Sequence, residues 1–332
     1  MKWSKIREHE KEIVSITIMA SILPFILISG GIMTIGYLFP TWFPFDQTNL
    51  LMLSLLLGAL ASPTAPAATL AVIHQYHAKG KVTDTILGVA ALDDVLGVLI
   101  FSLTIAFVLI VAQETFEFSN SPLINAVFHI GAAIMIGTVL GLALDPIANW
   151  IEVRGEGQWV VIIFSLIIFA AGVCELFDLD ILLCAITMGI VVVNHSKHHQ
   201  VIFELLERYT EDLIFLFFFL LSGLHLDLSV VPAALGLTLI FVFFRTAGKY
   251  MGAYWGARLV KADHSIQKYT AGGLLPQAGI VIGLVLSIYQ HPPFMAISEV
   301  LLATIMGATL IHELIGPIAA KFSLTKTGEI KV

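Results

Sequence analysis

Long apolar stretches separated by short polar segments run through the whole chain of 332 residues. A helix needs about 20 apolar residues to cross a hydrocarbon core of roughly 30 Å, so this pattern predicts an all-α protein of membrane-spanning helices. We expect ten spans, at residues 13–39, 49–74, 83–111, 122–149, 159–177, 180–194, 211–224, 230–257, 267–289 and 294–320. Only Asp178-Leu179-Asp180 separates the fifth span from the sixth, so one bent helix is the alternative there.

Composition strengthens the membrane assignment. Hydrophobic residues make up 58% of the chain, charged residues 12%, and the mean hydropathy is +0.93, values that exclude a soluble globular domain. The net charge of −7 comes from acidic residues spread over the loops, and we expect no nucleic-acid partner and no cofactor. Cys174 and Cys184 fall in predicted spans, where thiols act as small apolar side chains.

Basic residues occupy alternate loops. They stand before the first span and after the second, fourth, sixth, eighth and tenth: Lys2, Lys5, Arg7, Lys11, Lys79, Lys81, Arg154, Lys197, Arg208, Arg258, Lys261, Lys268, Lys321, Lys326 and Lys331. The intervening loops contain neither Lys nor Arg, and short cytoplasmic loops carry the positive excess. The pattern therefore predicts a multi-pass protein of the cell (inner) membrane with both termini of this chain in the cytoplasm. Arg245 and Lys249 are the exceptions, because they fall inside a span.

Two adjacent carboxylates interrupt the third span. Asp93 and Asp94 lie within the apolar run from Ile86 to Val111. One charge near a bilayer centre costs roughly 2.5–3.5 kcal/mol on insertion scales, so the pair indicates an ion or proton site. Neighbouring residues of a helix project about 100° apart, which lets one carboxylate face a cavity and the other a neighbouring helix.

Proline and glycine interrupt two further spans, the second and the ninth. Each is the middle member of a triplet of helices, at residues 13–111 and 230–320, and the two triplets start on opposite sides of the membrane. The residues expected at the crossing of the broken helices are Pro63, Ala65, Pro66, Pro276, Gln277 and Gly279. Two inverted three-helix repeats with broken middle helices crossing near mid-membrane are the signature of a secondary-transporter site.

Five segments carry a resemblance to a known family. They are Ser62-Pro63-Thr64-Ala65-Pro66, Ala91-Leu92-Asp93-Asp94-Val95-Leu96-Gly97, Gly223-Leu224-His225-Leu226-Asp227-Leu228, Arg245 with the glycine-rich stretch to Arg258, and Leu275-Pro276-Gln277-Ala278-Gly279. Over nearly the whole chain the sequence resembles the monovalent cation:proton antiporters of the sodium/hydrogen exchanger type, in the bacterial branch with an Asp-Asp pair. The resemblance implies a transporter, not an enzyme, that exchanges sodium for protons by alternating access in pH homeostasis.

The resemblance also implies roles for individual residues. Asp94 looks like the carboxylate for which sodium and proton compete, with the Thr64 hydroxyl as a further sodium ligand and Ser62 beside it. Asp93 resembles a neighbour that forms an ion pair with a basic residue of the second repeat. We expect Arg245 as that partner, with Lys249 as the substitute. Ala65 departs from the family, since many relatives carry Asp at this position.

The domain organisation follows from the same resemblance. Residues 1–112 and 230–322 are expected to form a core domain from the two repeats, 159–229 a partial scaffold or dimerisation domain, 113–158 a linking helix and 323–332 a short cytoplasmic tail. Family members usually have about twelve to fourteen spans, so we expect the first helices to be missing before residue 1. A homodimer is expected if those helices are present.

Other assignments remain open from the sequence alone. A cation channel or potassium-efflux carrier is one alternative, and an intramembrane aspartyl protease is a weaker one, since adjacent carboxylates on one helix cannot face each other across a peptide bond. His195, His198 and His199 are expected in a solvated loop. We expect His312 and Glu313, in the last span, to be structural, with assistance to proton entry as the alternative for Glu313.

Overall fold

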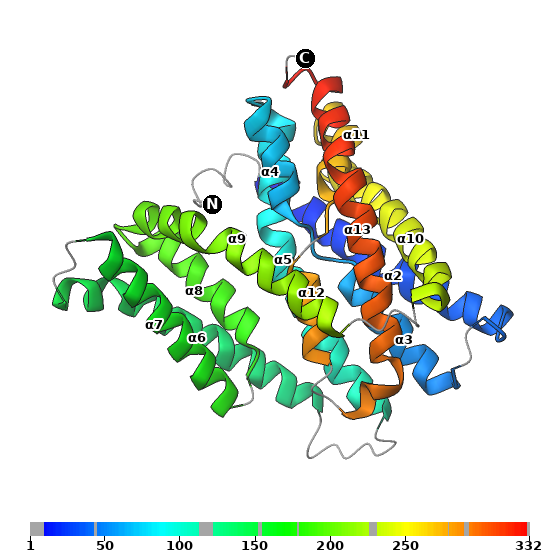
Figure 1. Ribbon diagram of the computed structural model, residues 1–332. Helices are drawn as coiled ribbons and strands as arrows, with labels where there is room; N and C mark the ends of the chain where they lie inside the picture. Colours follow the sequence, from blue (N-terminus) through cyan, green and yellow to red (C-terminus); the bar gives the residue numbers. More distant parts are fainter. Residues whose placement is uncertain are drawn as a thin grey trace. The chain divides into compact units, whose positions relative to one another are not determined.

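The computed structural model describes residues 10–42, 45–112, 122–151, 155–177, 179–225, 231–277, 279–288 and 292–330, and all regular elements in these ranges are helices. The chain divides into two compact units (Figure 1). Unit 1 comprises Met1–Lys5 and Thr115–Phe219, and unit 2 comprises Ile6–Glu114 and Leu220–Val332.

Unit 1 is a small helical bundle. It contains α6 (Pro122–Trp150), α7 (Glu156–Leu176), α8 (Ile181–His195) and most of α9 (His199–His225). A Cβ on Gly137 would lie 2.4 Å from the Cys184 carbonyl oxygen, so this glycine allows α6 and α8 to pack with their backbones close together. The Asp180 side chain accepts a hydrogen bond of 3.0 Å from Leu183 N and caps α8, so the fifth and sixth predicted spans are separate helices and the bent helix is excluded.

The predicted seventh span is part of a longer helix. Helix α9 begins at His199, whereas the apolar stretch was expected to begin at residue 211. The first turns of α9 carry Glu204, Glu207 and Arg208, and these polar residues hide a helix from a criterion based on hydrophobicity alone.

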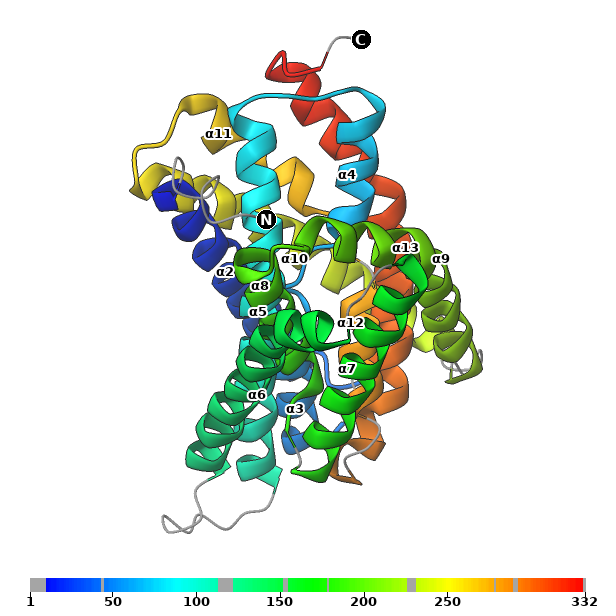
Figure 2. The ribbon, with the colours of Figure 1, turned by 90° about the vertical axis from the view of Figure 1, so that its left-hand side faces the viewer.

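Unit 2 contains both repeats. The first consists of α2 (Glu10–Leu38), α3 (Gln47–Leu60), α4 (Pro66–Gln75) and α5 (Lys81–Ala112). The second consists of α10 (Val231–Leu259), α11 (His264–Tyr269), the 3₁₀ helices η2 (Thr270–Leu274) and η3 (Pro292–Phe294), α12 (Gly279–Ile288) and α13 (Met295–Lys326). In both repeats the middle helix is broken, as the sequence predicted. The halves α4 and α11 lie at the end of the unit that holds the C-terminus, and α3 and α12 lie toward the other end (Figures 1 and 2).

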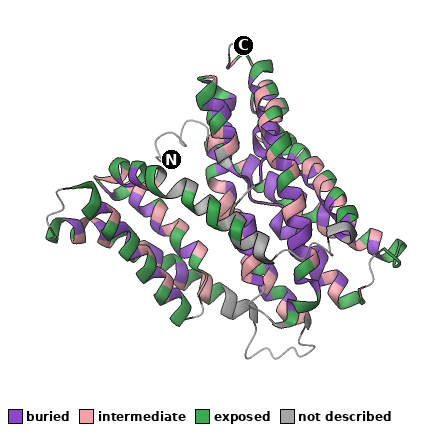
Figure 3. Ribbon diagram, in the orientation of Figure 1, coloured by how far each residue is buried: buried purple, intermediate pink, exposed green. Residues whose placement is uncertain are grey.

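Helices α2 and α10 pack with their backbones in contact. Cβ atoms on Gly248, Gly252 and Gly256 would lie 2.4–2.7 Å from main-chain atoms of α2, with Gly252 nearest at 2.4 Å from the Met19 carbonyl oxygen. Small residues spaced by four allow such close approach of membrane helices. Buried residues gather on the faces that these helices turn toward one another, while exposed apolar residues cover their outer faces (Figure 3). This packing fixes the height of α10 along α2, and with it the height of the basic residues that α10 carries.

The membrane character predicted from the sequence is reproduced by the helices. Six described helices are long and apolar enough to cross a membrane, at Glu10–Leu38, Lys81–Val111, Val127–Trp150, Glu156–Leu176, Ala234–Leu259 and Met295–Lys326. Two shorter apolar helices, Gln47–Leu60 and Ile181–His195, match the beginning of the second span and the sixth.

The last helix is longer than expected and ends in an ordered turn. Helix α13 continues to Lys326, past the predicted end at residue 320, and Gly328 turns the chain with a positive φ of 74°. The Glu329 carboxylate accepts hydrogen bonds from Val82 N (2.8 Å) and Thr83 N (2.7 Å), at the start of α5. The chain beyond α13 therefore caps the helix that carries the paired aspartates.

Candidate ion-binding site

The break in the first repeat lies between α3 and α4. Residues 61–65 are not helical, and Pro66 begins α4 at a position where a missing N–H costs nothing. The backbone N–H of Ala65 donates a hydrogen bond of 2.9 Å to the Pro276 carbonyl oxygen, which belongs to the other break. The two interrupted segments therefore bond to each other directly.

The break in the second repeat lies between η2 and α12, which starts at Gly279. Gln277 Nε2 donates to the Leu60 carbonyl oxygen at 3.0 Å, and Thr69 Oγ1 donates to the Gly273 carbonyl oxygen at 2.8 Å. Non-helical backbone is tolerated in a membrane protein when neighbouring groups satisfy its hydrogen bonds. Here a side chain from each repeat donates to a main-chain carbonyl oxygen of the other repeat.

Arg245 joins the two breaks. Its side chain is fully buried in α10 and donates three hydrogen bonds to carbonyl oxygens: Nε to Ala61 (3.1 Å), Nη2 to Pro63 (2.8 Å) and Nη1 to Leu275 (2.7 Å). The planar guanidinium presents several donors in a fixed geometry, which suits it to hold carbonyls from two segments at once.

Lys249, one turn further along α10, forms the ion pair with Asp93. Its Nζ lies 2.6 Å from Asp93 Oδ2, and neither side chain is exposed. The same Nζ donates to the Ser62 carbonyl oxygen at 2.5 Å and to Thr64 Oγ1 at 2.9 Å. The expectation that Arg245 would be the partner is wrong in this structure, because the guanidinium is occupied by the freed carbonyls and the ammonium stands at the level of the carboxylate.

Asp93 is fully engaged. Besides Lys249, its carboxylate accepts hydrogen bonds from the hydroxyl groups of Thr64 and of Ser21, the latter at 2.7 Å. Ser21 lies on α2, is fully buried, and was not identified from the sequence, where it is one of several hydroxyl residues in an apolar span. A carboxylate with this many donors has little capacity for a further ligand.

Asp94 differs from its neighbour. It is partly exposed, its Oδ1 is buried without a hydrogen-bond partner among the described residues, and its carboxyl group interacts with the backbone N–H of Thr64. The Ser62 hydroxyl is likewise buried and without a partner in the described ranges. The site thus contains unused oxygen atoms from Asp94 and from the first break, while the Thr64 hydroxyl is bonded to Lys249 and Asp93.

Gly97 brings the break against the helix of the aspartates. A Cβ at this position would lie 2.6 Å from Pro63 Cγ and 2.9 Å from Pro63 Cδ. Gly97 follows Asp94 by three residues, so the proline contacts α5 one turn from the paired carboxylates. The absence of a side chain here lets the broken segment reach the carboxyl groups.

Most other predicted residues fall where the sequence placed them. Pro66 and Gly279 begin the helices that follow the two breaks, and Ala65 lies in the first break. Of the segment 223–228, residues 226–228 lie outside the described ranges. Of the three histidines expected in a loop, His195 ends α8, His199 begins α9 and only His198 lies between the helices. Asp145 accepts from Ser196 Oγ at 2.5 Å and lies 3.6 Å from His198 Nδ1.

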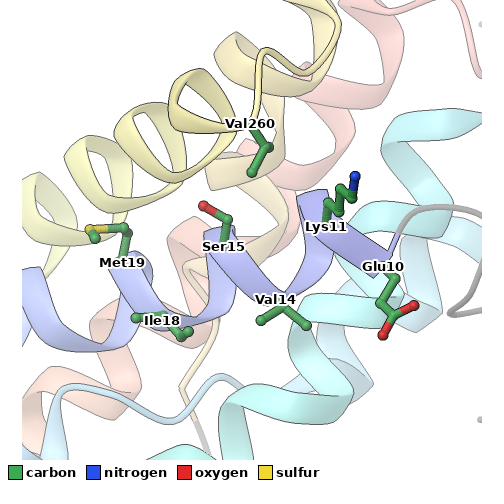
Figure 4. A pocket seen from close by; sticks show the side chains of 7 residues that line it. All are labelled: Glu10, Lys11, Val14, Ser15, Ile18, Met19 and Val260. Atoms are coloured by element: carbon green, nitrogen blue, oxygen red, sulfur yellow. The ribbon is translucent and has the colours of Figure 1, made fainter.

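A groove of about 530 Å³ in unit 2 is distinct from this site. It is lined by residues of α2 and by Val260, namely Glu10, Lys11, Val14, Ser15, Ile18, Met19 and Val260 (Figure 4). None of the residues of the paired-aspartate site lines it. The paired-aspartate site therefore lies outside this groove and consists of close-packed polar groups.

The fold and the site together define a secondary transporter of the membrane. Broken helices of two inverted repeats meet beside the buried Asp93–Lys249 ion pair and the neighbouring Asp94, and such crossings hold the substrate and coupling ions in transporters. The chain belongs to the sodium/hydrogen exchanger family, because the family described as "Sodium/hydrogen exchanger, transmembrane" matches residues 1–326. Members of this family are transporters, so the protease alternative is excluded.

Two known proteins are similar to this chain. The Na(+)/H(+) antiporter NhaP of Pseudomonas aeruginosa is 24% identical over 288 residues, which are 80% of this chain and 65% of that protein, so the chain spans about two thirds of this relative's length. The solved structure of the sodium proton antiporter MjNhaP1 from Methanocaldococcus jannaschii at pH 8 superposes with a TM-score of 0.75 and 16% identity, covering 98% of this chain and 81% of that one. The second likeness shows that the fold is shared.

Proposed function

We propose that this protein exchanges a monovalent cation for protons, that the cation is sodium, and that both ions compete for Asp94. The observation that carries the proposal is the contrast between the two carboxylates. Asp93 is bonded to Lys249, Thr64 and Ser21, whereas Asp94 Oδ1 is buried without a partner in the described part of the chain. A buried carboxylate oxygen without a donor is costly, and a bound proton or cation removes that cost.

The charges of the site support a monovalent ligand. The Asp93 charge is balanced by Lys249, so the Asp94 carboxylate adds one negative charge to the site. One sodium ion or one proton matches that charge, whereas a divalent cation would add a further positive charge near the buried Lys249 and Arg245. Competition of this kind couples the two fluxes if only the occupied states of the carrier reorient.

The available ligands support a hard cation. Asp94 and Ser62 offer buried oxygen atoms without partners in the described ranges, and the hydroxyl of Thr64, in the same break as Ser62, is a third candidate oxygen. Hard cations take oxygen ligands. We therefore assign Asp94, Ser62 and Thr64 as the ligands of the transported cation, with water and backbone carbonyls completing its shell.

The two repeats are proposed to move as the transport core. Residues 1–112 and 230–322 carry the site, 159–229 provide a scaffold and 113–158 link the two, while access alternates by movement of the core. The one-sided distribution of Lys and Arg supports cytoplasmic termini of this chain in the cell (inner) membrane. We propose that the protein acts as a homodimer.

The test uses the purified chain in proteoliposomes that contain a pH-sensitive dye. We expect sodium to dissipate an imposed pH gradient, Asp94→Asn to abolish this effect, and Asp84→Asn, an exposed carboxylate on the same helix, to leave it unchanged. Lithium and potassium are compared in the same assay. Sodium-driven proton flux that survives Asp94→Asn would contradict the proposal, and cation flux without any coupled proton movement would instead establish the channel or potassium-efflux alternative.

A further inference from the structure

The second repeat contains a polar cluster that the site described above does not use. We call it the α13 cluster, and it consists of Gln277, Thr309, His312 and Glu313. Gln277 is fully buried and His312 is 1% exposed. Several of its buried atoms have no hydrogen-bond partner within the described part of the chain: Gln277 Oε1, Thr309 Oγ1, both ring nitrogens of His312, and Glu313 Oε1. Groups of this kind are costly to bury and call for a ligand.

The cluster occupies the place in the second repeat that the ion site occupies in the first. A Cβ on Gly316 would lie 2.5 Å from Pro276 Cγ and 2.9 Å from Pro276 Cδ, nearly the same contact that the first repeat makes between its glycine and its proline. Glu313 precedes Gly316 by three residues, which is the spacing from Asp94 to its glycine. Gln277 follows Pro276 directly, so Glu313 and Gln277 correspond by position to Asp94 and Thr64.

The residues of the cluster come from two elements, which meet where Gly316 of α13 packs against Pro276. Thr309, His312 and Glu313 are spaced by three and four residues on α13, so they share one face of the helix. Gln277 comes from the second break, where its Nε2 is fixed on the Leu60 carbonyl oxygen and its Oε1 is left without a donor among the described residues.

The charged groups that act on Glu313 come from α10. Arg245 interacts electrostatically with Glu313 and with His312, and Lys249 acts on His312. Arg245 is hydrogen-bonded to carbonyl oxygens, and no ion pair within 4.0 Å joins it to Glu313 in the described structure. Helices α3, η2 and α12, which also pack near α13, contain no ionisable side chain, and those of α4 and α11 are limited to His74, His264, Lys268 and Tyr269.

We propose that the α13 cluster is a second proton-binding site, in which Glu313 takes the proton. With Glu313 ionised, the orphaned acceptors are the Glu313 oxygen, the Gln277 oxygen and one nitrogen of His312, while the donors are the Thr309 hydroxyl and the other nitrogen of His312. A proton adds a donor to the Glu313 carboxyl group while the other oxygen of that group remains an acceptor, so it supplies a donor that the cluster lacks. A proton from water bonds to a single oxygen and needs no shell of ligands, so it suits a site beside Arg245 better than a metal cation does.

The consequence, which rests on the proposed function, is that the chain binds protons at two places of which only one competes with sodium. Asp94 has unused hydroxyl and carboxylate oxygens around it for a cation, whereas the α13 cluster offers a carboxylate, an amide oxygen and an imidazole beside a guanidinium. The second site therefore adds a proton-dependent step that sodium does not displace directly.

The test reads protonation itself rather than transport. Infrared difference spectra of the purified full chain, recorded between acidic and alkaline pH, report each carboxylic acid through its C=O stretch. We expect one band to disappear in Glu313→Gln and to be insensitive to sodium. A second band is expected to disappear in Asp94→Asn and to be suppressed by sodium. Glu299→Gln, an exposed glutamate on the same helix, serves as the matched control and is expected to leave both bands intact.

Two results would overturn the proposal. One is a Glu313→Gln spectrum identical to that of the unmodified protein. The other result applies if the Gln variant does not fold. It is a Glu313→Asp spectrum in which no carboxylic acid band is shifted from its position in the unmodified protein. A sodium-insensitive band at Asp94 would contradict the proposed function and leave the second proton site standing, so the two failures are distinguishable.

Discussion

Lys249 Nζ lies 2.6 Å from Asp93 Oδ2, and both side chains are completely buried. The two residues belong to different repeats, with Asp93 on α5 and Lys249 on α10. Their pairing leaves Asp94, one position further along α5, as the carboxylate with a buried oxygen that no described donor reaches.

Removing the ammonium should destabilise the protein strongly. Lys249→Met leaves the Asp93 carboxylate buried without its cation, and breaking one side of a buried ion pair costs about 3–5 kcal/mol. The loss is measured as a lowered thermal unfolding midpoint in detergent. Lys268→Met, on an exposed lysine of α11, is the control and should change the midpoint little. A Lys249→Met protein as stable as the control would contradict the ion pair.

Arg245 should not be replaceable by lysine. Its three hydrogen bonds reach carbonyls of both breaks, and an ammonium on a flexible stem cannot span them together. Each hydrogen bond from a charged group contributes about 1.5–3 kcal/mol, so Arg245→Lys should lower stability by several kcal/mol at most and loosen the crossing. Hydrogen exchange at the Ala65 amide, which bonds to Pro276, reports that loosening. Unchanged exchange there would show that Arg245 does not hold the breaks together.

Gly97 and Gly316, which pack against the prolines of the two breaks, should respond alike to substitution by alanine. Gly97→Ala and Gly316→Ala place a Cβ 2.6 Å and 2.5 Å from the break prolines, and overpacking of this kind costs about 1–3 kcal/mol. Gly30→Ala on α2, where nothing lies within 4 Å of the added Cβ, is the control. Thermal unfolding of the three variants measures the difference. Equal stability of all three would mean that the breaks are not pressed against α5 and α13.

Sodium affinity should depend on pH in one direction. If a proton and sodium compete for Asp94, acidification lowers apparent sodium affinity by about tenfold per pH unit once the carboxyl is mostly protonated, while the maximal rate stays constant. Initial rates of dye dequenching over a matrix of pH and sodium concentrations test this relation. A maximal rate that falls with acidification at constant sodium affinity would exclude simple competition.

The residues that follow α13 should stabilise the first turn of α5. Glu329→Ala removes the acceptor for Val82 N and Thr83 N, and loss of such a helix-terminal contact costs about 0.5–2 kcal/mol. Amide exchange at Val82 and Thr83 should accelerate in this variant and remain unchanged in Glu299→Ala. Equal exchange in both variants would show that the carboxylate does not protect these amides.

The broad architecture was readable from the sequence because its signals are local. Hydrophobic runs predict the spans, and Pro63, Pro66, Pro276 and Gly279 predict where two of them break. These features depend on the residues themselves and hardly on the rest of the protein.

The pairing of the charges was not readable, because it depends on helix register. Arg245 and Lys249 stand one turn apart, and which of them meets Asp93 is decided by the packing of α10 on α2 through Gly248 and Gly252. Ser21 was missed for the same reason. A buried hydroxyl in an apolar helix carries no signal until the helix facing it is known.

The ion pair across the repeats has a consequence for the protein as two halves. The first half holds both aspartates and the second holds both basic residues, so neither half contains a neutral site. Produced as separate polypeptides, one half would carry uncompensated negative charge in its interior and the other uncompensated positive charge. Charge neutralisation between Asp93 and Lys249 would then favour association of the two halves. The candidate ion-binding site would form only in the associated protein.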